Sequence, residues 1–202
     1  MRDVVSEPQS RRRVPIGRWV LATSLGWVAS IPIMVLFSVG AEAVGLPEGQ
    51  FALGLAMGAT IGFLQWLVAR RSFGATSVWF WASAIGMTLP FALCDLIGCN
   101  LDGSILIVPA ALGALLVGIG QHRLFGIRSI RAYFWAPASA IAWTLAAATT
   151  LALLAIRYNP ASGPLQWLRP LLAFVSGGIV LGVITGCVLV WLFRSPPDNR
   201  MG

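Results

Sequence analysis

The sequence predicts an all-α membrane protein with six transmembrane helices, arranged as three helical hairpins of the same orientation. Three observations support this. The chain is 57% hydrophobic and only 10% charged, whereas soluble domains carry about 25% charged residues. Several runs of roughly 20 residues have few or no charges, which is the length that crosses a bilayer as a helix. Small residues recur at every fourth position in alternate runs, as in closely packed membrane helices.

The predicted helices follow one another with short connections. Residues 1–17 are polar and arginine-rich, and we expect a cytoplasmic tail there. The transmembrane domain covers 18–194, with helices at about 19–39, 51–69, 77–96, 104–124, 133–156 and 171–193. Pro32 should kink the first helix, a change that membrane helices tolerate. Residues 195–202 contain Pro196-Pro197 and are expected to form a second cytoplasmic tail.

The helices repeat a pattern two at a time. The first helix of each pair carries a tryptophan, then two small residues three and seven positions on, then a large residue. This spacing occurs at 19–27, 79–87 and 135–143. The predicted hairpins cover about 18–71, 77–128 and 133–194. Each hairpin crosses the membrane twice, so the copies share one orientation, and an axis along the membrane normal would relate them.

The second helix of each hairpin carries a stripe of small residues. The stripe residues are Gly54, Gly58 and Gly62, then Ala110, Ala114 and Gly118, and finally Gly178 and Gly182. Residues four apart lie on one helical face, so another backbone can approach there. Close packing at these positions should supply much of the contact energy, because lipid gives helices no hydrophobic reason to associate. Small residues on both helices of a hairpin predict that these two helices face one another.

One return helix carries a short motif. Residues Gly62 to Arg71 read Gly-x2-Gln-Trp-Leu-Val-x-Arg-Arg, and this hairpin resembles the repeats of a loose group of bacterial polytopic membrane proteins. The resemblance covers most of the chain, although the second copy departs from the motif after Gln121 and the third lacks the glutamine. The resemblance implies no function. Mitochondrial carriers also have three tandem hairpins, but the proline–acidic signature of their odd helices is absent here.

The arginines predict the orientation. All 14 basic residues are arginine, and the formal net charge is +7. Only Arg157 and Arg169 fall on the outer side of the predicted topology, and short arginine-rich loops stay cytoplasmic. We therefore expect a multi-pass protein of the bacterial inner membrane with both termini in the cytoplasm. Topology and attraction to anionic lipid account for the charge, so the bilayer is the expected partner and nucleic acid is not.

The chain contains nine tryptophans. Trp19, Trp66, Trp79, Trp135 and Trp191 lie near the predicted cytoplasmic helix ends. Indole rings favour the headgroup level because they are apolar with one N–H donor. An aromatic belt at the membrane surface is therefore expected, with stacking on a pigment or quinone as the alternative.

Four polar residues could line a substrate path. Gln65 and Gln121 occupy equivalent places near the cytoplasmic ends of their helices, and Thr185 takes that place in the third hairpin. Their side chains could instead join helices by hydrogen bonds. Asp95 is the only carboxylate in or beside a predicted span. It is either an interfacial loop acid or a group that handles protons or cations.

The cysteines and the single histidine offer further candidates. Cys94 and Cys99 lie at the predicted outer surface, where an oxidising compartment would allow a disulfide. Cys187 is most simply a packing residue. His122 could ligate a haem or chlorin, but a histidine at a helix end beside arginine is typical of an interfacial residue. No metal site is expected, because the ligands fall on opposite sides of the membrane.

The sequence favours a non-catalytic role. It contains no nucleotide-binding loop, no His-Glu-x-x-His and no Gly-x-Ser-x-Gly. We expect an accessory or scaffolding subunit of a larger membrane complex that contacts other subunits, lipids or lipophilic cofactors. The alternative is a small-molecule or ion transporter with a path lined by the four polar residues. An enzyme acting on lipid is the third and least favoured hypothesis.

Overall fold

The computed structural model describes residues 14–43, 49–99, 103–125, 130–156 and 168–193, and this part of the chain is all-helical. It contains six helices that are long and apolar enough to cross a membrane. They are α1 (Ile16–Ala43), α2 (Phe51–Phe73), α3 (Val78–Leu96), α4 (Ile107–His122), α5 (Trp135–Ala155) and α6 (Leu168–Phe193). Short 3₁₀ turns at Gly103–Leu106, Arg123–Phe125 and Ile130–Phe134 flank α4 and α5.

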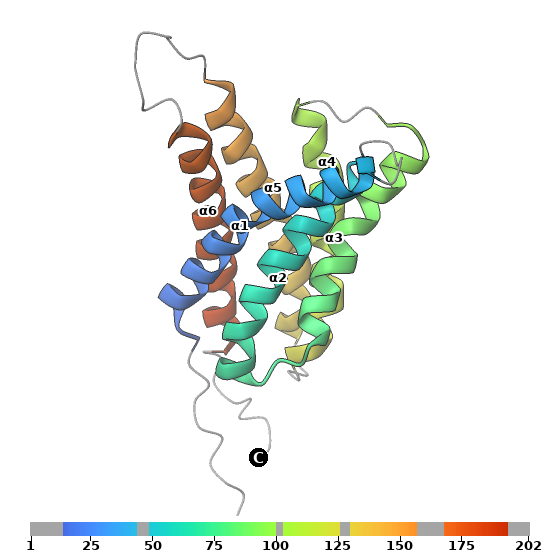
Figure 1. Cartoon of the computed structure of the whole chain (residues 1–202). Helices are drawn as coiled ribbons and strands as arrows, with labels where there is room; N and C mark the ends of the chain where they lie inside the picture. Colours follow the sequence, from blue (N-terminus) through green and yellow to red (C-terminus); the bar gives the residue numbers. More distant parts are fainter. Residues whose placement is uncertain (1–13, 44–48, 100–102, 126–129, 157–167, 194–202) are drawn as a thin grey trace, which may run out of the picture.

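The six predicted spans are confirmed, with ends that move by a few residues. The largest change is in α1, which runs from Ile16 to Ala43 instead of 19–39. Pro32 lies inside α1, and Figure 1 shows that this helix bends so that its second half crosses the end of α2. Most of the two predicted tails lies outside the described residues.

The helices form a closed ring in sequence order. Each helix packs against the helix before it and the helix after it, and α6 packs against α1. The chain therefore alternates up and down around the ring (Figure 1). With an even number of helices, α1 begins at the same end of the bundle at which α6 ends.

The small residues of the return helices pack against the following hairpin. A Cβ added at Gly58 of α2 would lie 2.7 Å from the Met87 Cβ of α3 and closer still to the Ser83 carbonyl oxygen. The two helices of each hairpin do pack against each other, as predicted, but the stripe of α2 faces α3 and not the other helix of its own hairpin. The same rule holds elsewhere: Gly54 and Gly62 lie against α3, Gly118 against α5, and Gly178 and Gly182 against α1.

Within each hairpin a different glycine makes the close contact. A Cβ added at Gly26 of α1 would lie 2.7 Å from the Ile61 Cα of α2. Gly86 of α3 approaches Val117 of α4 in the same way, and Gly177 of α6 approaches the backbone of α5. Every neighbouring pair in the ring thus meets at a glycine, which lets the backbones approach closely without a hydrophobic driving force.

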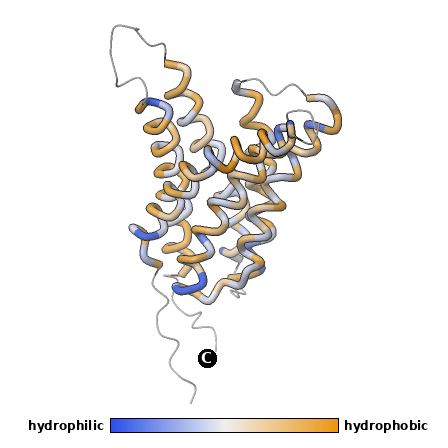
Figure 2. The backbone as a smooth tube through the Cα atoms, in the orientation of Figure 1, coloured by the Kyte–Doolittle hydropathy of each residue, from blue (hydrophilic) through white to orange (hydrophobic). Residues whose placement is uncertain are grey.

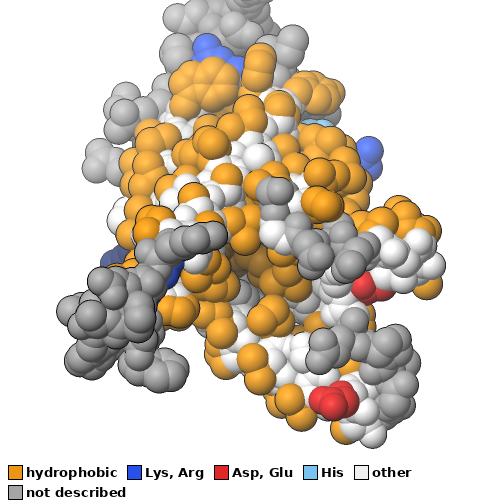
Figure 3. Space-filling view, turned by 90° about the horizontal axis from the view of Figure 1, so that it is seen from above, with side chains coloured by type: hydrophobic (Ala, Val, Ile, Leu, Met, Phe, Trp, Pro, Cys, Tyr) orange, Lys and Arg blue, Asp and Glu red, His pale blue; other side chains and the backbone are white. Residues whose placement is uncertain are grey.

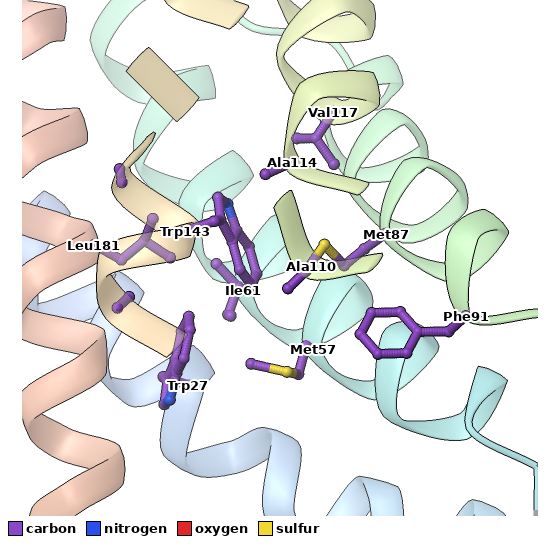
Figure 4. Packing of buried hydrophobic residues seen from close by; sticks show 12 residues of the cluster. Trp27, Met57, Ile61, Met87, Phe91, Ala110, Ala114, Val117, Trp143 and Leu181 are labelled. Atoms are coloured by element: carbon purple, nitrogen blue, oxygen red, sulfur yellow. The ribbon is translucent and has the colours of Figure 1, made fainter. Parts of the chain in front are cut away.

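The interior between the helices is filled by apolar side chains. The central cluster draws residues from all six helices, and Figure 4 shows Trp27, Trp143, Ile61 and Leu181 beside one another within it. Trp27 and Trp143 pack with ring centroids 5.2 Å apart. The cluster consists of Trp27, Met57, Ile61, Met87, Phe91, Ala110, Ala114, Val117, Ala142, Trp143, Ala146 and Leu181.

The outer surface is apolar as well. Large hydrophobic side chains are exposed on all six helices, and Figure 2 shows that hydrophobic residues occur along the whole bundle. Seen from above in Figure 3, hydrophobic side chains are spread over the described part of this face, interleaved with backbone and other side chains. In α1, Val35, Leu36 and Val39 beyond Pro32 are each more than half exposed. A surface of this composition contacts lipid in a membrane.

Candidate functional site

The most distinctive polar feature is a layer of buried side chains inside the ring. Each helix contributes one of them, and together they form what we call the buried polar layer. Its members are Thr23, Gln65, Ser83, Gln121, Ser139 and Thr185, and each is 6% exposed or less. Uncompensated polar groups are costly in an apolar interior, so the partners of these groups determine what the layer can do.

Inside a hairpin, each glutamine donates to a hydroxyl of the preceding helix. Gln65 Nε2 lies 3.1 Å from Thr23 Oγ1, and Gln121 Nε2 lies 2.9 Å from Ser83 Oγ. The two hydroxyls in turn donate to the backbone carbonyls of Trp19 and Trp79, each at 2.9 Å. Each hydroxyl therefore accepts one hydrogen bond and donates another.

Between hairpins, the contacts run through tryptophan. Trp135 Nε1 donates to Gln121 Oε1 at 3.0 Å, and Trp19 Nε1 donates to Thr185 Oγ1 at 2.9 Å. Gln121 thereby joins α3 to α5, and the Trp19 bond joins α6 to α1. Trp79 Nε1 is buried without a hydrogen-bond partner in the described structure, so the third such contact is not made.

Six aromatic rings close the end of the ring next to this layer, and we call them the aromatic plug. They are Trp19, Trp79, Trp135, Phe73, Phe125 and Phe193; the first five belong to one buried cluster, and the half-buried Phe193 packs against it. The three phenylalanines contact one another, with ring centroids 5.1–6.0 Å apart. The Trp79 ring lies 5.8 Å from Trp19 and 5.9 Å from Trp135. Such edge-to-face and tilted pairs are favourable beyond their area.

These contacts correct the prediction of an aromatic belt for three tryptophans. Trp19, Trp79 and Trp135 are each 1% exposed or less, so they lie inside the ring and not at the headgroups. The indole N–H groups of Trp19 and Trp135 donate to polar side chains in the interior. An indole that faced lipid would have no such partner. Trp66 is half-buried and Trp191 is 46% exposed, and they pack with Arg70 and Arg131.

Asp95 lies away from the glutamines and caps a helix. Its two carboxylate oxygens accept hydrogen bonds from the backbone N–H groups of Gln50 and Phe51 at 2.8 and 2.7 Å. Phe51 is the first residue of α2, where a negative charge complements the helix dipole. Ser83 and Asp95 are separated by about 18 Å along α3, at 1.5 Å per residue. Of the four candidate path residues, three therefore share one layer and Asp95 does not.

Arg169 has a matching role at the start of α6. Its guanidinium donates to the carbonyl oxygens of Leu153, Leu154 and Ile156 at the end of α5. A cation at a helix C-terminus stabilises it, because the last carbonyls lack partners in the helix.

His122 lies at the end of α4. Its Nδ1 is 2.6 Å from the Ile119 carbonyl oxygen, and its ring packs on Tyr133 with centroids 5.5 Å apart. Donation from Nδ1 would leave Nε2 as the acceptor nitrogen. The role of His122 as a cofactor ligand stays a prediction.

Three hydroxyls of the polar layer, those of Thr23, Ser83 and Ser139, were missed by the sequence analysis, although a signal exists. The three tryptophans of the aromatic plug, Trp19, Trp79 and Trp135, are each followed four positions later by one of these hydroxyl residues. Four positions is about one helical turn, so the hydroxyls of Thr23 and Ser83 reach the carbonyls of Trp19 and Trp79. The pattern used for the prediction included the small residues three and seven positions after the tryptophan but not the hydroxyl residue four positions after it.

Chemically, the layer offers hydroxyl, amide and indole groups, which form hydrogen bonds but do not titrate near neutral pH. Among the described residues, no three His, Cys, Asp or Glu side chains gather where they could hold a metal ion. No protein family model, no curated protein and no solved structure matches the chain.

Proposed function

We propose that this integral membrane protein is a non-catalytic accessory or scaffolding subunit of a larger bacterial membrane complex. The observation that carries the proposal is the pairing within the buried polar layer. Gln121 directs its amide N–H to Ser83 and its oxygen to Trp135. Groups engaged in this way join helices and hold the ring in one shape. A rigid ring with an apolar outer surface suits contact with other subunits, lipids or lipophilic cofactors.

The proposal includes an internal repeat. Three hairpins of one orientation would place equivalent residues at one level of the ring, and the buried polar layer has this composition. The hydroxyl residues come from α1, α3 and α5, while Gln65, Gln121 and Thr185 come from α2, α4 and α6. Stripe glycines of α2, α4 and α6, such as Gly58, Gly118 and Gly178, each contact the next helix around the ring, which supports a threefold relation.

The proposal also includes a cytoplasmic location for the plugged end, in a bacterial inner membrane. Near this end lie Arg18, Arg70, Arg71, Arg123 and Arg131. Of the described arginines, Arg169 alone lies towards the opposite end. Arginine on cytoplasmic loops is the expected bias. Reporter fusions to both ends of the chain test this, and an outward signal from either would overturn it.

The alternative is a transporter whose path runs past Gln65, Gln121 and Thr185. Such a path must hold water at the level of the glutamines. Burial of these side chains and the aromatic plug beneath them support the subunit hypothesis instead. Access of water-soluble reagents to this level therefore separates the two hypotheses.

The first experiment measures that access in native membranes. In a chain whose three cysteines are replaced by alanine, Gln121→Cys and Gln65→Cys are treated with a charged thiosulfonate. We expect no labelling within the time that labels Arg71→Cys fully, because Arg71 is exposed and the glutamines are not. Leu112→Cys, which is 53% exposed on the lipid-facing side of α4, controls for burial in lipid. Labelling of both glutamine positions would support the transporter.

The second experiment tests for partners. A photoreactive group that does not require lysine is placed at an exposed apolar position of the tagged chain. The chain is cross-linked in native membranes and then purified in mild detergent. A subunit should yield a cross-linked species of fixed stoichiometry with another membrane protein, and the same species should persist without cross-linking on a native gel. A chain that migrates alone or only with copies of itself would contradict the proposal.

A further inference from the structure

The end of α3 is a turn of a defined type. Gly98 has a positive φ of 70°, which favours glycine. The Gly98 N–H donates to the Asp95 carbonyl at 3.3 Å, and the Cys99 N–H donates to the Cys94 carbonyl at 2.9 Å. This pair of bonds around a left-handed glycine is the Schellman motif, in which the residues at the positions of Cys94 and Cys99 come into side-chain contact.

The motif places the two cysteines within reach of a disulfide. From the 2.9 Å bond and standard backbone bond lengths, the Cα atoms of Cys94 and Cys99 are at most about 7 Å apart. Disulfides usually join Cα atoms about 4.4–6.8 Å apart. Both side chains pack against the central apolar cluster, so they lie on the same side of the turn. Both cysteines are free thiols in this structure.

We propose that Cys94 and Cys99 form an intramolecular disulfide in the cell and act as a redox-dependent clasp on the end of α3. The oxidant is a disulfide-bearing protein that acts by thiol–disulfide exchange. A Cys94 or Cys99 thiolate attacks the disulfide of this carrier protein and forms a mixed disulfide with it. The second cysteine then displaces the carrier from the mixed disulfide, and the Cys94–Cys99 S–S bond forms. The carrier leaves as a dithiol, having taken up the two electrons and two protons that the cysteines lose.

The clasp would act on α2 through Asp95. Asp95 lies between Cys94 and Gly98 in the same turn, and its carboxylate holds the first N–H groups of α2. A covalent bond across the turn would fix the backbone that positions this carboxylate. The oxidised chain should therefore hold the α2–α3 contact more firmly than the reduced chain.

The first test counts free thiols as they exist in the cell. Cells are quenched in acid, the denatured protein is alkylated with N-ethylmaleimide, and the intact mass of the purified chain is measured. We expect one adduct, on Cys187, and two more after reduction. The Cys187→Ala chain should carry none before reduction and two after it. Cys94→Ala and Cys99→Ala should each carry two without reduction. Three adducts on the unreduced wild-type chain, or a disulfide-linked dimer on a non-reducing gel, would overturn the proposal.

The second test asks whether the bond clasps the turn. The thermal midpoint of the purified chain in detergent is measured with and without tris(2-carboxyethyl)phosphine. Reduction should lower the midpoint of the wild-type and Cys187→Ala chains by several degrees and leave Cys94→Ala unchanged. An equal effect of the reductant on Cys94→Ala would show that the bond has no such role. Both tests are independent of the proposed subunit function.

Discussion

At the scale of single residues, the polar groups of the interior serve to join helices. Gln121 is 1% exposed and yet carries a full amide. It is tolerated because Ser83 accepts from its N–H and Trp135 donates to its oxygen. Which amide atom is nitrogen follows from this network, since the two partners have opposite hydrogen-bonding roles. The residue that sequence reasoning treated as either a path lining or an interhelical bond thus makes two interhelical bonds.

The two glutamines should differ in their contribution to stability. Gln121→Leu removes two interhelical hydrogen bonds and leaves the Trp135 N–H buried without a partner, whereas Gln65→Leu removes the single side-chain bond to Thr23. We expect Gln121→Leu to cost about 1–2 kcal/mol and Gln65→Leu about half of that, at roughly 0.6 kcal/mol per bond. Thermal unfolding in detergent measures both. Trp135→Phe should cost less in the Gln121→Leu chain than in the wild-type chain, and an equal cost in both would show that the Trp135 bond is not made.

At the scale of helices, the packing of the ring depends on the positions of glycines, which have no side chain and let a neighbouring backbone approach. Helix α2 presents Gly54, Gly58 and Gly62 to α3, and the Ser83 and Met87 region fills the groove that they leave. Lipid surrounds the outer faces, so burial of apolar area cannot distinguish one helix partner from another. Shape at the glycines makes the choice instead.

An alanine at Gly58 should disrupt this contact, while an alanine at Gly40 should not. A Cβ at Gly58 would overlap the α3 backbone, whereas a Cβ at Gly40 of α1 meets nothing within 4 Å. Overpacking costs about 1–3 kcal/mol, and alanine gains up to about 1 kcal/mol of helix propensity at an open site. Gly58→Ala should therefore lower the thermal midpoint in detergent, and Gly40→Ala should keep or raise it. An unchanged midpoint for Gly58→Ala would mean that this stripe faces lipid.

At the scale of the molecule, closure of α6 onto α1 makes a ring instead of a row of hairpins. The buried polar layer and the aromatic plug, which lie at one end of the ring, stabilise this closure. The Trp19–Thr185 bond ties the first helix to the last, and the aromatic plug brings together the ends of α2 and α6 and the turn after α4. Loss of the plug should consequently affect the whole ring.

Phe125 is the test of that role, because it contacts Phe73, Trp79, Trp135 and Phe193. Phe125→Ala leaves a cavity among buried rings, which typically costs about 3–5 kcal/mol. Phe134→Ala, at a residue 57% exposed that contacts Trp191, should cost far less. Unfolding in detergent gives the stabilities. The thiosulfonate reagent should also reach Gln121→Cys faster in the Phe125→Ala chain, and protection as complete as before would argue against a plug.

Part of this structure is determined by the local sequence. The six spans follow from runs of apolar residues, and the stripes follow from spacing along a helix. The contacts within one turn, such as the hydroxyl of Thr23 on the Trp19 carbonyl, depend only on helical geometry. Asp95 was recognised as unusual, but its pairing with Gln50 and Phe51 joins two helices 45 positions apart in the chain.

The sequence by itself determined that the chain crosses a membrane as six helices and that glycine and alanine would make their contacts, because length, hydropathy and helical period are local properties. Only the tertiary structure decided which helix each stripe faces, that Trp19, Trp79 and Trp135 turn inward, and that the ring closes between α6 and α1. The physical reason is that an apolar side chain has nearly the same free energy against lipid as against another helix. The choice between the two depends on close fit, which exists only once the six helices are assembled.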